Sequence, residues 1–258
     1  MSPNLVQKQF GDNAERYVTS KVHAQGASLA EMVRLAAPQP HWLALDVAPG
    51  GGHSALAIAR HVRRVIALDI TFPMLQAART FASEQDQTNI RWVQGDGERL
   101  PFDNARFDLI TCRVALHHFP HQAAAIADWA RCLKPGGRLV LVDNIGPNDP
   151  AANAYINAFE KLRDPSHGRL YPQSEVAEFL ERAGLLVISS AHLRKPMGFQ
   201  AWMNRMQVNA ADQQQLTRML WDSDGDAREF LNPRGTGEET TFDLWEGLFL
   251  AQKPASSR

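Results

Sequence analysis

Short apolar runs alternate with segments of helical periodicity over the first half of the chain. The apolar runs are typical of buried parallel strands, and they lie at Leu43 to Val47, Val65 to Leu68, Ile90 to Val93, Phe107 to Arg113 and Arg138 to Asp143. The helical segments between them lie at Ala55 to Ala59, from Pro73 to about Ser83 and at Gln122 to Leu133. This alternation predicts a parallel sheet with right-handed crossovers.

The pattern is different at the two ends of the chain. Residues Gln9 to Ala37 have helical periodicity, with Gly26 as a break. After the fifth strand, helices are expected at Ala151 to Arg163, at Ser174 to Ala183 and as two or three short pieces between Met197 and Gly237. Two further strands are expected at Leu185 to Ser190 and Thr241 to Ala251. The helices at Ala151 to Arg163 and between Met197 and Gly237 are therefore expected to be insertions.

A glycine-rich turn joins the first strand to the first helix. In LALDVAPGGGHSALAIA, residues 43–59, the glycines Gly50, Gly51 and Gly52 let the backbone turn sharply and approach a ligand that a Cβ would block. N–H groups at the start of the helix can hold a negatively charged group. Asp69 ends the second strand, at the spacing of an acid that holds ribose hydroxyls. A dinucleotide site would need G-x-G-x-x-G, and this turn has A-P-G-G-G-H.

The composition narrows the class of protein. The 258 residues suffice for one large domain or for one domain with a cap, and a hydrophobic share of 44% suffices for a core. Because 27 basic and 28 acidic residues nearly cancel, a strongly basic face for nucleic acid is not expected. No apolar run approaches the roughly 18 residues of a membrane span, and the N-terminus lacks a signal-peptide pattern. Cys112 and Cys132 are expected to be reduced core residues of a cytoplasmic protein.

Five stretches of the chain, taken in order, resemble the class I S-adenosylmethionine-dependent methyltransferases. They are LDVAPGGGH, IALDITFPML, GDGERLPF, FDLITCRVALHHF and LKPGGRLVLVDN, and they cover roughly Leu43 to Asn144. The resemblance is strongest to the methyltransferase type 11 group, which includes ubiquinone/menaquinone-biosynthesis enzymes. The family usually has glycine where Ala48 stands, and Ala48 is expected to serve this turn if its backbone keeps a negative φ.

The resemblance implies a Rossmann-like α/β fold. We expect a doubly wound, seven-stranded sheet, mostly parallel with an antiparallel last strand, and helical cap insertions. The whole chain, 1–258, would be one methyltransferase domain, with an N-terminal helical cover at 1–40 and cap insertions at 145–172 and 197–237. S-adenosyl-L-methionine would be the co-substrate, without a metal.

The candidates for contact with the cofactor follow the ends of the first four strands. They are Asp46, Ala48, Gly50, Gly52, His53, Asp69, Ile70, Met74, Asp96, Gly97 and Arg113. Asp46 could orient the glycine loop and the cofactor's amino group, or it could be a structural acid that accepts loop amides. Asp69 offers two acceptor oxygens to the two ribose hydroxyls, or it caps the following helix.

The adenine ring has its own candidates. Ile70 and Met74 could enclose the ring, and Asp96 could accept its amino group while Gly97 leaves room for it. Ordinary core and turn residues would produce the same pattern, so both interpretations stay open.

The catalytic candidates are His117, His118, Arg163 and His167. The adjacent histidines follow the fourth strand, at the edge of the sheet where ligands lie, and one is expected to face the site while the other packs or caps. A neutral histidine would be the natural base for a hydroxyl or acidic C–H acceptor. The loop RDPSH, with Arg163 and His167, could recognise the acceptor or could cap helices. The spacing of Cys112 and the histidine pair does not favour a metal site.

The sequence therefore predicts methyl transfer from S-adenosylmethionine to a small-molecule acceptor by in-line displacement, with O-, C- or N-methylation left open. Two alternatives remain, a cofactor-binding protein without catalysis and an RNA or protein methyltransferase. We expect a cytoplasmic monomer or homodimer without nucleic-acid partners. The regions around Tyr17 and His23 and the segment Met197 to Gly237 are expected to form a mobile cover over the site.

Overall fold

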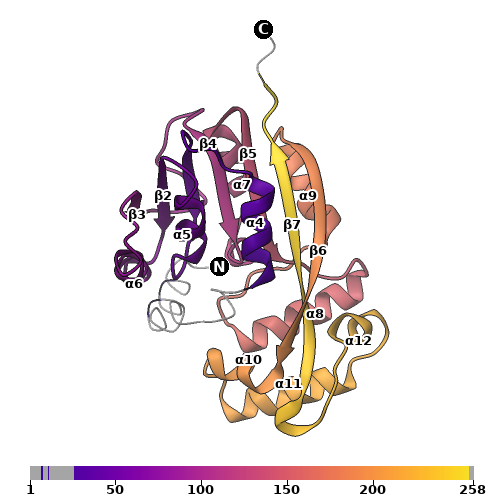
Figure 1. Ribbon diagram of the computed structural model, residues 1–258. Coiled ribbons are helices and arrows are strands. Elements are labelled where there is room, and N and C mark those ends of the chain that lie inside the picture. Colours follow the sequence, from indigo (N-terminus) through magenta and orange to yellow (C-terminus); the bar gives the residue numbers. More distant parts are fainter. Residues whose placement is uncertain (1–6, 8–10, 12–25, 256–258) are drawn as a thin grey trace.

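A seven-stranded sheet forms the centre of the computed structural model, which describes residues 7, 11 and 26–255. The strands are β1 (Leu43–Val47), β2 (Arg64–Asp69), β3 (Ile90–Gln94), β4 (Phe107–Arg113), β5 (Leu133–Asn144), β6 (Leu186–Gly198) and β7 (Thr241–Gln252). Their order is β3-β2-β1-β4-β5-β7-β6 (Figure 1). The first five strands pair in parallel, and β7 is antiparallel to both β5 and β6. The predicted fold class is confirmed.

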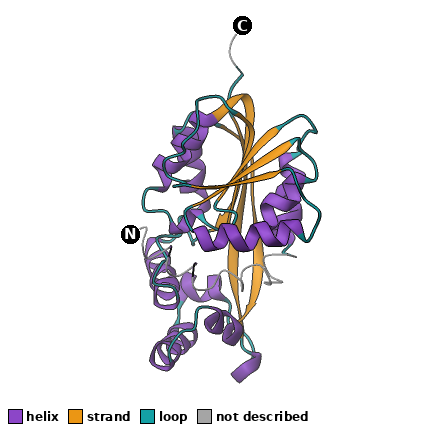
Figure 2. Ribbon diagram, turned by 90° about the vertical axis from the view of Figure 1, so that its left-hand side faces the viewer, coloured by secondary structure: helices purple, strands orange, loops and turns teal. Residues whose placement is uncertain are grey.

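Helices cover both faces of this sheet (Figure 2). The helices that pack on it are α4 (Ala27–Ala36), α5 (His53–Ala59), α6 (Phe72–Ser83), α7 (Gln122–Cys132) and α9 (Gln173–Arg182). Because successive strand residues point to opposite faces, neighbours such as Val140 and Leu141 belong to different buried clusters. Burial on both faces explains why β1, β2 and β4 are apolar runs without alternation, whereas the edge strand β3 is partly exposed.

The remaining helices form a cap with its own hydrophobic core. They are α8 (Pro150–Arg163), α10 (Phe199–Arg205), α11 (Ala210–Asp222) and α12 (Gly225–Leu231). Phe159, Trp202 and Phe242 pack at the centre of this core, with ring centroids 4.9 Å apart for Phe159 and Trp202. In Figure 1 the long strands β6 and β7 run from the sheet into the cap, and residues of both strands belong to its core. The expected short helices are confirmed, and Trp202 is a core residue of the cap.

Two strand boundaries differ from the prediction. Residues Lys134 to Gly137, which precede the predicted fifth strand, belong to β5, with a register shift opposite Phe107 and Leu109 and a positive φ at Gly136. Strand β6 continues beyond Ser190 to Gly198, because its second half pairs with β7 on the way into the cap. This half of β6 is a strand because it pairs with a distant segment of the chain, and its own sequence has no apolar periodicity that would have indicated a strand.

The expected cover from the N-terminus is described only from Gly26, which precedes α4 as its N-cap. The prediction for Tyr17 and His23 falls outside the described residues. In the part of the chain that is described, no helix has the length and apolar character needed to cross a bilayer.

Candidate functional site

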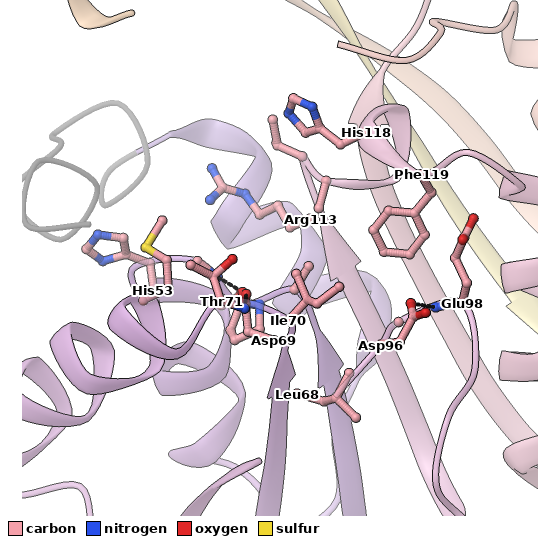
Figure 3. A pocket seen from close by; sticks show the side chains of 18 of the residues that line it. His53, Leu68, Asp69, Ile70, Thr71, Asp96, Glu98, Arg113, His118 and Phe119 are labelled. Carbon is pink, nitrogen blue, oxygen red and sulfur yellow. Dashed lines mark hydrogen bonds between the residues drawn. The ribbon is translucent and has the colours of Figure 1, made fainter. Parts of the chain in front are cut away.

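A pocket opens at the carboxyl ends of β1, β2 and β4 and beside the turn that follows β3. Figure 3 shows labelled side chains from these elements around it. Of the predicted cofactor residues, those that line the pocket are Ala48, Gly50, His53, Asp69, Ile70, Met74, Asp96, Gly97 and Arg113. Asp46 and Gly52 lie behind the lining. Of the predicted catalytic residues, His118 lines the pocket, whereas His117, Arg163 and His167 do not.

The glycine turn has a backbone that the sequence did not predict at Ala48. Its φ is 52°, in the left-handed region, so the expectation of a negative φ is wrong. The Ala48 N–H bonds the Leu68 carbonyl at 2.8 Å, which ties the end of β1 to β2 and holds this conformation. For an alanine it costs about 1–2 kcal/mol. Glycine would avoid that strain.

Gly52 has a structural reason to be glycine. Its φ is 87°, and an added Cβ would lie 3.1 Å from the Ala78 Cβ and 3.2 Å from the Trp92 ring. The residue therefore lets α5 begin close to α6 and β3, and it supports the turn from behind.

Asp46 is fully buried behind the same turn. Its carboxylate accepts hydrogen bonds from the Ser54 hydroxyl at 2.6 Å and from the Thr111 hydroxyl at 2.7 Å. Burial nevertheless raises the pKa of Asp46 to about 6. These bonds connect the first turn of α5 to β1 and β4. The placement matches the interpretation in which Asp46 orients the loop, and it gives Asp46 no position on the pocket surface.

Two carboxylates lie at the ends of neighbouring strands. Asp69, after β2, accepts the Thr71 N–H at 2.8 Å and the Gly50 N–H at 3.4 Å. Burial raises the pKa of Asp69 to about 6, so the group is ionised at neutral pH. Asp96, after β3, accepts the Glu98 N–H at 2.8 Å. Both carboxylates border the pocket in Figure 3, where dashed lines mark the bonds to Thr71 and Glu98.

The space beside Gly97 belongs to a protein side chain. An added Cβ on Gly97 would lie 2.8 Å from the Phe119 ring and 2.9 Å from Val47. Phe119 in turn lines the pocket. Gly97 thus makes room for the Phe119 ring, and because Gly97 itself also lines the pocket, its role in leaving room for the ligand ring stays a prediction.

The end of β4 brings a cation and a strained turn to the pocket. The Arg113 guanidinium contacts the Ser28 hydroxyl of α4 at 3.3 Å. Burial lowers the pKa of Arg113, with Glu246 and Asp46 acting in the opposite direction, and an arginine stays protonated under these conditions. Val114 has a φ of 53°, which is rare for a β-branched residue. This turn directs the chain into the 3-10 helix Leu116–His118.

The adjacent histidines have different partners. His117 binds Asp143 twice, from its backbone N–H and from Nδ1, at 2.6 Å each. His118 places its Nδ1 2.9 Å from the backbone carbonyl of Ser166. The two rings lie 4.1 Å apart. The expected division is seen, since one histidine lines the pocket and the other is anchored to the end of β5.

Their charges differ as well. Burial acts to lower the pKa of His117, but the Asp143 carboxylate outweighs it and the pKa is raised. Burial and the neighbouring His117 lower the pKa of His118 to about 4. At neutral pH His118 is therefore an uncharged imidazole on the pocket wall.

The loop Arg163 to His167 is anchored in the cap. Arg163 donates to the Trp202 carbonyl at 3.2 Å, and its guanidinium lies 4.8 Å from the centroid of the Trp202 ring. His167 is 2% exposed and bonds the Asn157 side-chain oxygen through Nε2 at 2.9 Å. Burial lowers the pKa of His167 to about 2. Neither side chain lines the pocket, so the expected contact with the acceptor does not match this placement.

Several lining residues were absent from the prediction. They include Ser54, Thr71, Glu98, Val114 and Phe119. Thr71 and Glu98 follow the two strand-end acids by two residues, and this spacing could have indicated them. Phe119 gave no local signal, because an aromatic residue after a histidine pair has the same pattern in a core.

Taken together, the pocket combines apolar walls with a few charged or polar groups. Carboxylates stand at two strand ends, a guanidinium at a third, and a neutral imidazole in the 3-10 helix that follows β4 (Figure 3). Such a site can hold a flat ring, a pair of vicinal hydroxyls and a carboxylate, and can accept one proton.

Comparisons with known proteins agree with this arrangement. The sequence model of a family described as a methyltransferase domain matches residues 45–141. A methyltransferase of Bacillus subtilis called YcgJ is 36% identical over 85% of this chain and 87% of its own length. The demethylmenaquinone methyltransferase of Listeria monocytogenes is 27% identical over 63% of this chain and 69% of its own length.

Two solved structures are similar over most of the chain. A Bacillus halodurans protein assigned as a methyltransferase has a TM-score of 0.85 and 35% identity, covering 89% of this chain and 100% of its own. The structure of YcgJ has a TM-score of 0.83 and 33% identity, covering 89% of this chain and 99% of its own.

Proposed function

Because this chain belongs to the class I S-adenosylmethionine-dependent methyltransferases, we propose that the pocket holds S-adenosylmethionine and that His118 serves methyl transfer to a small-molecule acceptor. The enzyme's methyl-transfer activity follows from the family. The observation that carries the finer proposal is the convergence of Asp69, Asp96, Arg113 and His118 on one pocket. In this proposal residues 1–258 act as one methyltransferase domain.

The residues of the pocket fit the parts of this co-substrate. An ionised carboxylate has about four acceptor sites. Asp69 accepts from the backbone N–H groups of Gly50 and Thr71 and from the Thr71 side chain, and its remaining acceptor capacity would serve the ribose hydroxyls. Asp96 would accept the adenine amino group, with Ile70 and Phe119 beside the ring. Arg113 would pair with the carboxylate of the methionine part, because it is the guanidinium on the pocket wall.

The chain's own contribution to the reaction is positioning and proton transfer. S-adenosylmethionine supplies a methyl group on a sulfonium, which is a good leaving group. The pocket aligns the reactants, and alignment alone can lower the barrier by several kcal/mol. His118 then accepts the proton that the acceptor releases.

The low pKa of His118 favours one kind of acceptor. An imidazole with a pKa of about 4 is a weak base and cannot ionise a carbon acid in advance. A neutral hydroxyl, in contrast, becomes strongly acidic as it gains the methyl group, and a weak base suffices to take its proton. A neutral amine needs no base for the methyl transfer, because the ammonium product can release its proton to water. We therefore favour an oxygen or nitrogen acceptor over a carbon acceptor.

The proposal is tested with methyl-labelled S-adenosylmethionine and a cell extract separated into small-molecule, protein and RNA fractions. We expect the label to appear in the small-molecule fraction, on oxygen or nitrogen by mass spectrometric fragmentation. Label confined to RNA or protein would contradict a small-molecule acceptor, and label on carbon would contradict the role of a weak base.

A further inference from the structure

The loop Arg163 to His167 lies against the histidine segment, although its charged side chains do not line the pocket. The backbone N–H groups of Gly168 and Arg169, just after the loop, both bond the His117 carbonyl, at 3.0 and 3.1 Å. The Ser166 carbonyl is 2.9 Å from His118 Nδ1. The Ser166 hydroxyl oxygen lies 3.4 Å from the same Nδ1, and because it donates its proton to Asp164 it can only accept from the ring. The segment that follows α8 and the 3-10 helix are thus joined through four contacts, two of which involve the ring of the pocket residue His118.

The contact with Ser166 determines which nitrogen of His118 carries the proton. A backbone carbonyl can only accept a hydrogen bond, so Nδ1 must be the donor. In the neutral ring the lone pair is then on Nε2. A free imidazole side chain favours the opposite tautomer, with the proton on Nε2, so the Ser166 carbonyl selects the less common form.

Asp164 shapes the loop that presents this carbonyl. Its Oδ1 accepts the Ser166 N–H at 2.8 Å and the Ser166 hydroxyl at 2.6 Å, and its own carbonyl accepts the His167 N–H at 2.9 Å. Asp164 and Ser166 are both buried. An aspartate that bonds the N–H two residues later forms an Asx turn, which fixes the direction of the peptide between them and after them.

His167 provides a contrast within the same loop. Its Nε2 bonds the side-chain oxygen of Asn157, and that atom is identified as the oxygen because it also accepts the Leu170 N–H at 2.7 Å. His167 therefore carries its proton on Nε2. His118, which contacts the loop, and His167, which belongs to it, are therefore held in opposite tautomers.

We propose that Asp164 is a positioning residue for the reaction and that it acts through Ser166. Asp164 holds the Ser166 carbonyl in place, and this carbonyl fixes His118 as the Nδ1–H tautomer with the lone pair on Nε2. This inference rests on the proposed role of His118 as the base. It assigns a function to the RDPSH loop that does not require Arg163 or His167 to touch the acceptor. Fixing the tautomer in advance removes a rearrangement from the proton-transfer step.

The test is a long-range ¹H–¹⁵N correlation spectrum of the full chain with ¹⁵N-labelled histidine, which distinguishes protonated from unprotonated ring nitrogens. Loss of one signal set in His118→Gln assigns His118. In the wild type we expect the proton on Nδ1 of His118 and on Nε2 of His167. A wild-type His118 with its proton on Nε2 would overturn the inference without any further variant.

Variants of Asp164 test the positioning step. Asp164→Ala should lose the Nδ1–H signature of His118 and lower turnover by up to about 10²-fold, the scale expected for a small displacement of a reacting group. Asp164→Asn keeps an acceptor oxygen for Ser166 and should restore both. The matched control is Asp149→Ala, which removes a comparable bond to the Ala152 N–H at the other end of α8, and it should keep the wild-type signature.

The outcomes separate this inference from the proposed function. An unchanged tautomer in Asp164→Ala, or the same loss in Asp149→Ala, would overturn the positioning role. The spectrum needs neither cofactor nor acceptor. Wild-type turnover in His118→Gln with the expected tautomer would instead count against His118 as the base.

Discussion

Replacement of Asp69 by asparagine tests the cofactor site most sharply. The side chain keeps its shape and an oxygen for the Thr71 N–H, which Asp69 holds at 2.8 Å, but it loses the negative charge. At neutral pH the wild-type group is ionised, because its pKa is about 6. Hydrogen bonds to a charged group contribute about 1.5–3 kcal/mol. We therefore expect Asp69→Asn to weaken binding of S-adenosylhomocysteine by about 10- to 150-fold.

The assay is isothermal titration calorimetry with S-adenosylhomocysteine, which needs no acceptor. Asp108→Asn is the matched control, because Asp108 also accepts a backbone N–H, from Leu43 at 2.9 Å, and does not line the pocket. Its affinity should equal that of the wild type. If Asp69→Asn binds as tightly as the control, the acid only caps the following helix, and its assignment to the ribose is wrong.

Three further predictions concern the same site. Ala48→Gly relieves a φ of 52° and should raise the free energy of unfolding by about 0.5–1 kcal/mol, measured by denaturant titration; a loss of stability would refute the strain. Lowering the pH from about 7.5 to about 5 protonates Asp69 and should weaken S-adenosylhomocysteine binding in the wild type more than in Asp69→Asn. If the affinities of the two proteins change with pH in the same way, Asp69 is not the titrating group. Cofactor should slow hydrogen exchange in the segment Met197 to Gly237 if the cap covers the site, and equal exchange with and without cofactor would contradict a cover.

The sequence predicted the parts of the fold that depend on local pattern. Strands β1, β2 and β4 are apolar runs because they are buried on both faces, whereas the edge strand β3 is partly exposed. The acids at the ends of β2 and β3 stand at the predicted edge. Strand β6 was predicted too short, since its second half is stabilised by pairing with β7 and not by its own composition.

The details of the site depend on contacts that a pattern does not contain. The φ of Ala48 is held by a bond to β2, and the space beside Gly97 is filled by Phe119 from a distant part of the chain. The charged and polar side chains of the RDPSH loop suggested contact with the acceptor, but Arg163 and His167 do not line the pocket. In the structure the loop's backbone carbonyl at Ser166 reaches the pocket residue His118 instead.

The central claim is that His118, held neutral on the pocket wall, accepts the acceptor's proton. The most direct measurement is the rate of label transfer from methyl-labelled S-adenosylmethionine to the small-molecule fraction of an extract, with wild type, His118→Gln and the exposed His121→Gln as control. We predict that His118→Gln lowers the rate by about 10²-fold or more while S-adenosylhomocysteine affinity stays intact, and that His121→Gln changes neither. Equal rates for His118→Gln and the wild type would contradict the claim.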